Sequence, residues 1–178
     1  MYTLDDVRAK CDDKNVVLEA IEQDGLLLEG ASEAFKDDKD IVMKAVTKDG
    51  GALEFASTRL KGDKDVLMRA VDTKGWVICY ASEELRKDKE LILKAAQKDG
   101  QILYYASQEL RNDYDVVLAA VKNKGLIVKY ASKQLRSDKT IALEAVKQDK
   151  RAIEFIVPEL RTDPDIQNIV NPPEEEKK

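Results

Sequence analysis

The side chains that could do chemistry in this chain recur in rows, with one member in each stretch of 25 residues. One row is basic, and a line of cations at fixed spacing could follow the phosphates of a nucleic acid, as in RNA-binding repeats. Its members are Lys36, Lys61, Arg86, Arg111, Arg136 and Arg161. Histidine is absent from the chain, which removes the commonest general base and the common Ser-His and Cys-His pairs. We therefore expect no catalytic residue, no metal site and no cofactor.

A structural role for the basic row competes with phosphate binding. Each cation is expected in the last turn of a helix, where it complements the negative end of the helix dipole. The chain carries 30 basic and 35 acidic side chains, a net charge of −5, and a general nucleic-acid binder would show a basic surplus. Stabilisation of helix ends is the favoured interpretation, and phosphate binding by Arg86, Arg111 and Arg136 is the alternative.

A second row is acidic and could be read as metal ligands. One carboxylate per repeat cannot converge on a single ion, because a cation needs several oxygens within about 2–2.6 Å. Aspartate is also a preferred residue just before the first turn of a helix. The row is therefore predicted to cap helices; it consists of Asp13, Asp38, Asp63, Asp88, Asp113, Asp138 and Asp163.

These rows arise from an internal repeat, and such a period indicates a stack of identical supersecondary units. The sequence predicts an all-α fold, an α-solenoid (superhelix) of six tandem 25-residue helix-turn-helix repeats over residues 13–162. Residues 1–12 are expected to form an N-terminal cap, with a helix from Thr3 to Cys11 in which Thr3 and Asp6 form a capping box. Residues 163–170 are predicted to be a C-terminal capping helix, so residues 1–170 form one domain. Residues 171–178 are expected to be a disordered charged tail.

Each repeat is predicted to be a hairpin of two α-helices. The first runs over about residues 14–24 in the first copy and ends at Gly25, which suits the left-handed conformation beyond a helix C-terminus. The second follows almost without a loop, with positions 27, 28, 31, 32 and 35 facing inward and positions 26, 29, 33 and 36 facing outward. In the last copy Pro158 is expected to interrupt this second helix.

The repeat D-K-x-x-[VIL]-x-[LM]-x-A…G…[YF]-A-S-x-x-L-[KR]-x-D resembles that of the domain-of-unknown-function family numbered 4116. The resemblance covers about residues 13–163. It implies helical repeats and carries no catalytic residue over to this chain, because the family has no assigned activity.

Outward positions that differ between the copies are the candidates for binding a partner, because the fold does not dictate them. Exposed Trp and Tyr are typical anchors of interfaces, and Trp76 with Tyr104 would form an aromatic pair on adjacent repeats. The candidate partner-binding residues are Trp76, Tyr104, Leu126, Lys129 and Gln101. Unconstrained drift on a wet surface would produce the same variation. A row of Tyr and Phe at position 30 of the frame is interpreted as packing rather than base stacking.

The favoured function is therefore a non-catalytic interaction scaffold for a protein partner, or a structural subunit of a larger assembly. A nucleic-acid-binding repeat protein is the alternative. Two isolated cysteines, Cys11 and Cys79, and the lack of a long apolar run favour a reducing, cytoplasmic location without membrane association. A secreted effector or a subunit of an organellar assembly is the alternative location.

Overall fold

The computed structural model describes residues 1–173, which contain helices and no strand. It divides into two compact units, Met1–Ala95 and Ala96–Lys178, with the boundary inside the helix α7 (Lys89–Lys98). In the first unit the α-helices are α1 (Leu4–Ala9), α2 (Lys14–Gln23), α3 (Glu33–Lys36), α4 (Lys39–Lys48), α5 (Thr58–Lys61) and α6 (Lys64–Thr73). The 3-10 helices of this unit are η1 (Gly25–Gly30), η2 (Gly50–Phe55), η3 (Gly75–Tyr80) and η4 (Leu85–Lys87).

The second unit repeats the same order of elements. Its α-helices after α7 are α8 (Tyr114–Asn123), α9 (Lys133–Arg136), α10 (Lys139–Gln148), α11 (Pro158–Arg161) and α12 (Pro164–Val170). Its 3-10 helices are η5 (Gly100–Tyr104), η6 (Leu110–Asn112), η7 (Gly125–Tyr130) and η8 (Lys150–Glu154). The predicted all-α repeat fold is confirmed.

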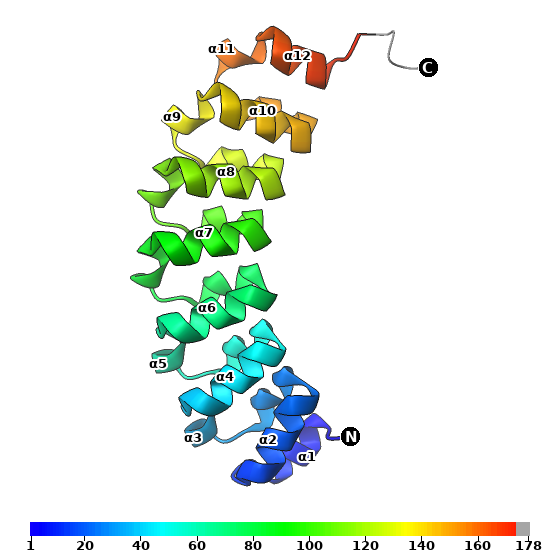
Figure 1. The fold of residues 1–178 in the computed structure, drawn as a ribbon, viewed down its shortest axis with the longest axis vertical. Coiled ribbons are helices and arrows are strands. Elements are labelled where there is room, and N and C mark those ends of the chain that lie inside the picture. Colours follow the sequence, from blue (N-terminus) through cyan, green and yellow to red (C-terminus); the bar gives the residue numbers. More distant parts are fainter. Residues whose placement is uncertain (174–178) are drawn as a thin grey trace. The chain divides into compact units, whose positions relative to one another are not determined.

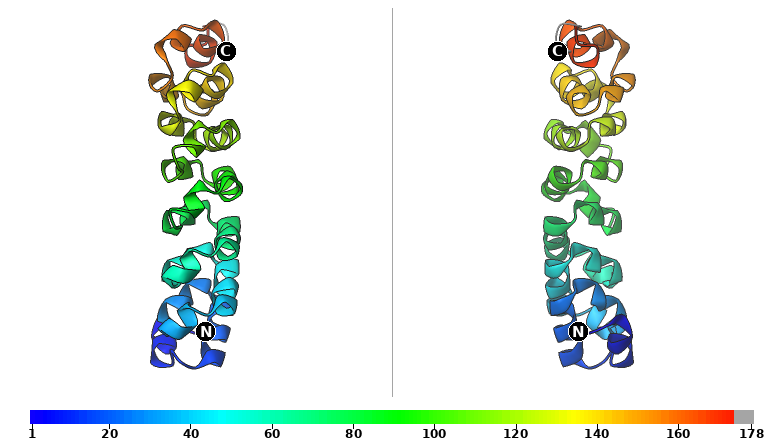
Figure 2. Two further views of the ribbon diagram at one scale, coloured as in Figure 1. Left: turned by 90° about the vertical axis from the view of Figure 1, so that its left-hand side faces the viewer. Right: turned by 90° about the vertical axis from the view of Figure 1, so that its right-hand side faces the viewer.

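Within each unit the repeats stack side by side in two layers (Figures 1 and 2). The ten-residue α-helices form one layer, in which α4 packs against α2 and α6, and α10 packs against α8 and α12. The 3-10 helices form the other layer, in which η2 packs against η1 and η3, and η7 packs against η5 and η8. A repeat therefore buries its apolar side chains largely on its neighbours, as in other repeat proteins.

The core comes from four positions in each long helix. In α4 these are Ile41, Val42, Ala45 and Val46, all of them 0–1% exposed, and the other long helices bury the same positions. Residues at i, i+1, i+4 and i+5 span a wide arc of a helix, so the helix contacts neighbours on more than one side. Burial of each valine, leucine or isoleucine side chain in this layer stabilises the fold by about 1.5–3 kcal/mol.

The aspartate row caps the long helices, as predicted. In every copy the Oδ1 atom of the aspartate accepts hydrogen bonds from backbone amides two or three residues later, at 2.9–3.3 Å. In several copies the Oδ2 atom also binds a lysine of the preceding repeat: Lys39 Nζ lies 2.8 Å from Asp63, Lys64 Nζ 2.8 Å from Asp88 and Lys139 Nζ 2.9 Å from Asp163.

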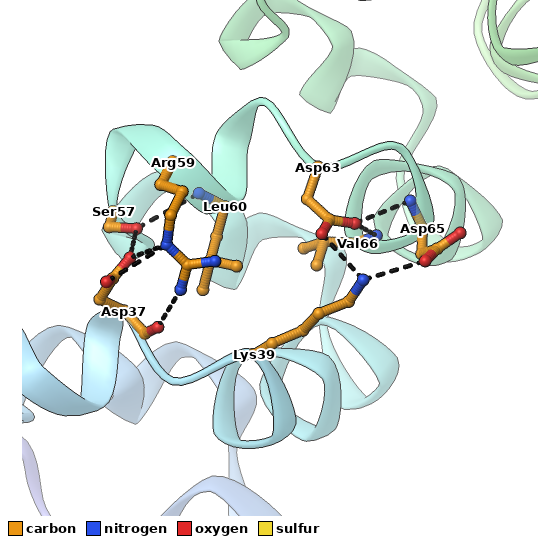
Figure 3. A network of polar contacts seen from close by, with 8 residues as sticks. All are labelled: Asp37, Lys39, Ser57, Arg59, Leu60, Asp63, Asp65 and Val66. Carbon is orange, nitrogen blue, oxygen red and sulfur yellow. Dashed lines mark hydrogen bonds and ion pairs between the residues drawn. The ribbon is translucent and has the colours of Figure 1, made fainter.

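Figure 3 shows one of these ion pairs, between the second and third repeats, together with a contact between the first and second repeats. Lys39 reaches both Asp63 and Asp65, while Asp37 accepts hydrogen bonds from Ser57 and Arg59. The lysines are about 40% exposed, so each pair contributes at most about 1 kcal/mol.

The prediction of one continuous second helix is wrong. A 3-10 helix and a second short helix replace it, and the second is an α-helix in four of the described copies and a 3-10 helix (η4, η6) in the other two. In the second copy, for example, the two are separated by residues with extended backbone, Ala56 (φ −65°, ψ 155°) and Ser57 (φ −58°, ψ 158°). Ser57 Oγ then accepts a hydrogen bond from the Leu60 amide and caps α5. The extended Ser57 also donates its own amide to the Lys36 carbonyl of the preceding repeat at 2.9 Å, and Ser132 does the same to Arg111 at 2.9 Å.

The left-handed role predicted for Gly25 and its equivalents is also wrong, because no described residue has a positive φ. The glycines instead allow a close approach between neighbouring repeats. A Cβ atom at Gly25, Gly50, Gly100 or Gly125 would lie less than 3.0 Å from the carbonyl oxygen of Ala45, Ala70, Ala120 or Ala145, respectively. In the last copy Lys150 occupies this position, is exposed, and donates from Nζ to the Val170 carbonyl at 3.1 Å.

The ends of the array follow the prediction in part. Thr3 and Asp6 form the expected capping box, and α1 ends at Ala9 rather than Cys11. Pro158 does not interrupt a helix; it begins α11, at a position that needs no amide donor. The C-terminal helix is α12 (Pro164–Val170), one residue shorter than predicted, and residues 174–178 of the predicted tail lie outside the described residues.

Candidate partner-binding site

The candidate partner-binding residues all lie on 3-10 helices. Gln101 and Tyr104 belong to η5 and Leu126 and Lys129 to η7, which are neighbours in the second unit. Trp76 belongs to η3 of the first unit. The Trp76 ring packs edge-on against Tyr80 of the same unit, with 5.8 Å between centroids. The pair of Trp76 with Tyr104 stays a prediction.

A hollow of about 420 Å³ lies between η5 and η7. Its lining consists of Gln101, Tyr104, Tyr105, Lys124, Leu126, Ile127, Lys129 and Tyr130. Four of the five candidate residues thus share one concave site, and Trp76 is not among its lining residues. The volume lies in the range of roughly 300–1,000 Å³ that is usual for ligand-binding pockets.

Three tyrosines build one wall of the hollow. The Tyr104 ring contacts Tyr105 at 5.1 Å between centroids and Tyr130 at 5.2 Å, both in edge-to-face geometry. Edge-to-face pairs add about 0.5–1.5 kcal/mol beyond the area they bury, so the Tyr104 ring is held in place. It is nevertheless 54% exposed, which leaves an ordered aromatic surface facing solvent.

The charged residues that line the hollow are both positive. Lys124 and Lys129 line it, and no carboxylate does. Lys129 Nζ lies 4.9 Å from the centroid of the Tyr130 ring and 6.0 Å from that of Phe155. Cation–π contacts of this kind are worth about 0.5–1 kcal/mol at exposed sites. The hollow therefore offers two ammonium groups and an aromatic wall to a bound molecule.

The corresponding place in the first unit, between η2 and η3, has its charges paired internally. Lys74, which corresponds to Lys124, forms an ion pair with Asp49 at 2.8 Å. Glu54, which corresponds to Tyr104, accepts a hydrogen bond from Tyr80, and burial together with this bond raises the pKa of Tyr80 to about 12. Asp99 corresponds to Asp49, and it caps η5 through the Gln101 amide at 2.9 Å without binding Lys124.

Sequence reasoning missed half of the lining. Tyr105 and Tyr130 belong to the aromatic row that was interpreted as packing, and both are half-buried, so they do pack while also facing the hollow. Lys124 was assigned to no site. Its position alternates between acid and base in the copies, as Asp24, Asp49, Lys74, Asp99, Lys124 and Asp149, and this reversal of charge is the signal that could have identified it.

The arginines of the basic row bind backbone carbonyls in or just after the 3-10 helices. Arg86 donates to the Cys79 carbonyl at 2.8 Å, and Arg111 donates to the carbonyls of Tyr104 at 2.6 Å and Ala106 at 3.1 Å. Arg136 donates to the Phe155 carbonyl at 3.2 Å. These bonds serve the carbonyl ends of separate 3-10 helices rather than the helix that carries each cation, so the predicted dipole role stays a prediction. The carbonyls at such an end lack intrahelical donors, and the guanidinium groups supply them.

Burial raises the pKa of the Cys79 thiol, which lowers the fraction of reactive thiolate at neutral pH. Within residues 1–173, no three side chains of Asp, Glu or Cys gather closely enough to hold a metal ion. Among the helices of this part of the chain, none has the length and apolar content needed to cross a bilayer.

A family model described as Domain of unknown function (DUF4116) matches four segments, residues 13–61, 63–111, 88–136 and 113–161. The matches span two repeats each and together cover most of the chain. Neither a curated protein nor a solved structure matches the chain significantly.

Proposed function

Since the chain belongs to the DUF4116 family of helical repeats, whose description assigns no activity, we propose that it is a non-catalytic interaction scaffold. It presents the outer surface of the 3-10 layer to a protein partner, with the hollow between η5 and η7 as the contact site. The convergence of Gln101, Tyr104, Leu126 and Lys129 on this hollow is the observation that supports the proposal most directly.

Different positions of the repeat have different roles, and this difference supports the proposal. Positions that keep the same residue type in all or most copies have internal roles: aspartate caps a helix, glycine leaves space for a neighbouring carbonyl, and arginine binds the end of a 3-10 helix. The hollow is lined partly by positions that change type from copy to copy. A surface that the fold does not dictate is free to be shaped by a partner, and an exposed, fixed tyrosine is a typical anchor for one.

No observation favours the nucleic-acid alternative. Arg86, Arg111 and Arg136 donate to backbone carbonyls, which leaves fewer donors for phosphates. Membership of a larger assembly is compatible with the proposal, because a subunit would use the same exposed surface.

The test is capture of partners by the immobilised full-length chain from an extract of its native source. The wild type is compared with Tyr104→Ala, and proteins whose capture changes are identified by mass spectrometry, purified and titrated calorimetrically. We expect a partner whose affinity falls about 30-fold or more in Tyr104→Ala, since an anchor residue contributes about 2 kcal/mol or more.

The matched control is Tyr114→Ala. Tyr114 is another exposed tyrosine of the second unit, but it lies on α8 in the other layer. Circular dichroism establishes that both variants keep their helices. The proposal is refuted if no purified partner distinguishes Tyr104→Ala from the wild type, or if Tyr114→Ala weakens binding equally.

A further inference from the structure

We propose that the hollow between η5 and η7 recognises an acidic peptide segment of the partner. A carboxylate of the segment binds Lys124 and Lys129, and a neighbouring apolar side chain packs against Tyr104 and Leu126. This inference rests on the proposed function and specifies the chemistry of its contact site.

The charge of the hollow favours an acidic ligand. The two lysines line the hollow, which no carboxylate enters, and within the described chain neither ammonium group forms an ion pair. The chain as a whole has a net charge of −5, so this local positive charge runs against the average. An ammonium group carries three hydrogen-bond donors, and a carboxylate is the ligand on proteins that matches them.

Copies of the same repeat differ in whether this lysine forms an ion pair. Between η2 and η3 the cation is Lys74, and it is neutralised by Asp49 at 2.8 Å. Between η5 and η7 the equivalent cation is Lys124 and the equivalent acid is Asp99. Asp49 and Asp99 each accept a hydrogen bond from the amide two residues later, at 2.8 and 2.9 Å, and of the two only Asp49 also forms an ion pair with its lysine among the described residues. The same fold can therefore satisfy this lysine internally, and in the second unit it leaves the charge available to a ligand.

Side chains of the site are held in place before any ligand binds. Lys129 lies over the Tyr130 ring at 4.9 Å, and Tyr130 in turn contacts Tyr104 at 5.2 Å. A side chain that is held before binding loses less conformational entropy on binding, which favours affinity. The exposed Tyr104 ring and the half-buried Leu126 supply apolar surface beside the cations.

The composition of the hollow favours a peptide over a nucleic acid. A strand of RNA or DNA needs a line of cations along its backbone, whereas this site has two lysines within one hollow of about 420 Å³. Arginine is the residue suited to bidentate phosphate contacts, and no arginine lines the site. A volume of this size accommodates a few side chains of an extended peptide.

The experiment selects peptides from a random dodecapeptide phage library on the immobilised full-length chain, with counter-selection on Tyr104→Ala. We expect the selected peptides to be enriched in Asp or Glu next to an aromatic or aliphatic residue. The strongest peptide is then synthesised with a partner in which each acid is replaced by its amide, and both are titrated into the full-length chain.

We expect the amide peptide to bind about tenfold more weakly, and Lys124→Gln and Lys129→Gln each to weaken the acidic peptide by about fivefold. The weakening by the lysine variants should diminish in 0.5 M NaCl because salt screens exposed charges. Lys133→Gln is the control, since Lys133 is an exposed lysine of the same unit outside the hollow. It should leave the affinity unchanged.

Two results would overturn this inference. One is a selection that yields no peptide dependent on Tyr104, or yields such peptides without acidic enrichment. The other is equal affinity for the acidic and amide peptides or equal effects of the three lysine variants. Tyr104-dependent capture of a partner without acidic preference would remove the inference and keep the proposed function, whereas loss of Tyr104-dependent capture itself would remove the proposed function.

Discussion

Replacement of Gly50 by alanine should destabilise the protein, although alanine is ordinarily the better residue in a helix. The added Cβ atom would lie less than 3.0 Å from the Ala70 carbonyl oxygen and also close to Thr73 Oγ1. Thr73 Oγ1 accepts a hydrogen bond from the Gly50 amide at 2.7 Å. Forcing a methyl group into such a site costs about 1–3 kcal/mol. The lower entropy of the unfolded alanine chain offsets about 0.4–1 kcal/mol. The midpoints of the two ranges leave a net loss of about 1.3 kcal/mol.

Urea unfolding followed by circular dichroism measures this loss, and Gly62→Ala is the matched control. A Cβ atom at Gly62 would meet only the Arg59 and Thr58 carbonyls, at 3.4 and 3.7 Å, and its φ of −94° suits any residue. Gly62→Ala should therefore leave the free energy of unfolding unchanged or raise it by up to about 1 kcal/mol.

The variant Gly50→Asn separates close approach from a left-handed backbone. Asparagine tolerates the left-handed region better than alanine, so it would be the milder replacement if the backbone conformation were the constraint. If space is the constraint, the larger asparagine is at least as harmful as alanine. The reasoning fails if Gly50→Ala unfolds at the same urea concentration as the wild type, or if Gly50→Asn is more stable than Gly50→Ala.

Two further predictions concern the arginines and the titration of the fold. Arg111→Met should lower the free energy of unfolding by about 1.5–3 kcal/mol because it removes two charged donors from backbone carbonyls; a variant that instead loses only RNA affinity in a gel shift would support the phosphate-binding alternative. Thermal stability should be nearly constant between about pH 5.5 and 8.5, since no histidine titrates there. Hydrogen bonds from Lys139 lower the pKa of Asp163, and those from Ser57 and Arg59 lower the pKa of Asp37. Their contribution is present above the ordinary aspartate value of 3.8 and is lost as the pH falls through the lower folded-state pKa values. At the alkaline end, the pKa of Tyr80 is raised to about 12, so its contribution is present below the ordinary tyrosine value and disappears as the pH rises through 12. A melting temperature that drops between pH 6 and 8 would contradict this account.

The first helix of each repeat was predictable because its signals agree. An aspartate cap, apolar residues at helical spacing and a following glycine all mark the same ten-residue segment, as in α4 (Lys39–Lys48). The second half of the repeat was predicted as one helix because inward residues three and four apart fit both α and 3-10 geometry. A serine that recurs just after the aromatic and alanine positions, such as Ser57, is a preferred N-cap, and it was the available evidence for a break.

The left-handed conformation predicted for the glycine row was wrong for a related reason. Glycine beyond a helix most often signals a left-handed residue, and sequence alone does not reveal that a carbonyl of the next repeat occupies the space of its side chain. Lys150 in the last copy was the exception that could have pointed to a contact between repeats. At the site, variation between copies identified Tyr104 and Lys129, whereas Lys124 was missed because its position was counted as the end of the first helix.

The hydrogen bond from the Ser57 amide to the Lys36 carbonyl, repeated by Ser132 and Arg111, uses main-chain atoms alone. Any copy whose backbone follows the same path supplies both the amide donor and the carbonyl acceptor of this hydrogen bond, whatever its side chains. Gene duplication or loss of one whole copy therefore produces a matching junction at once, without compensating substitutions. The number of copies can therefore change separately from the residues that line the hollow between η5 and η7.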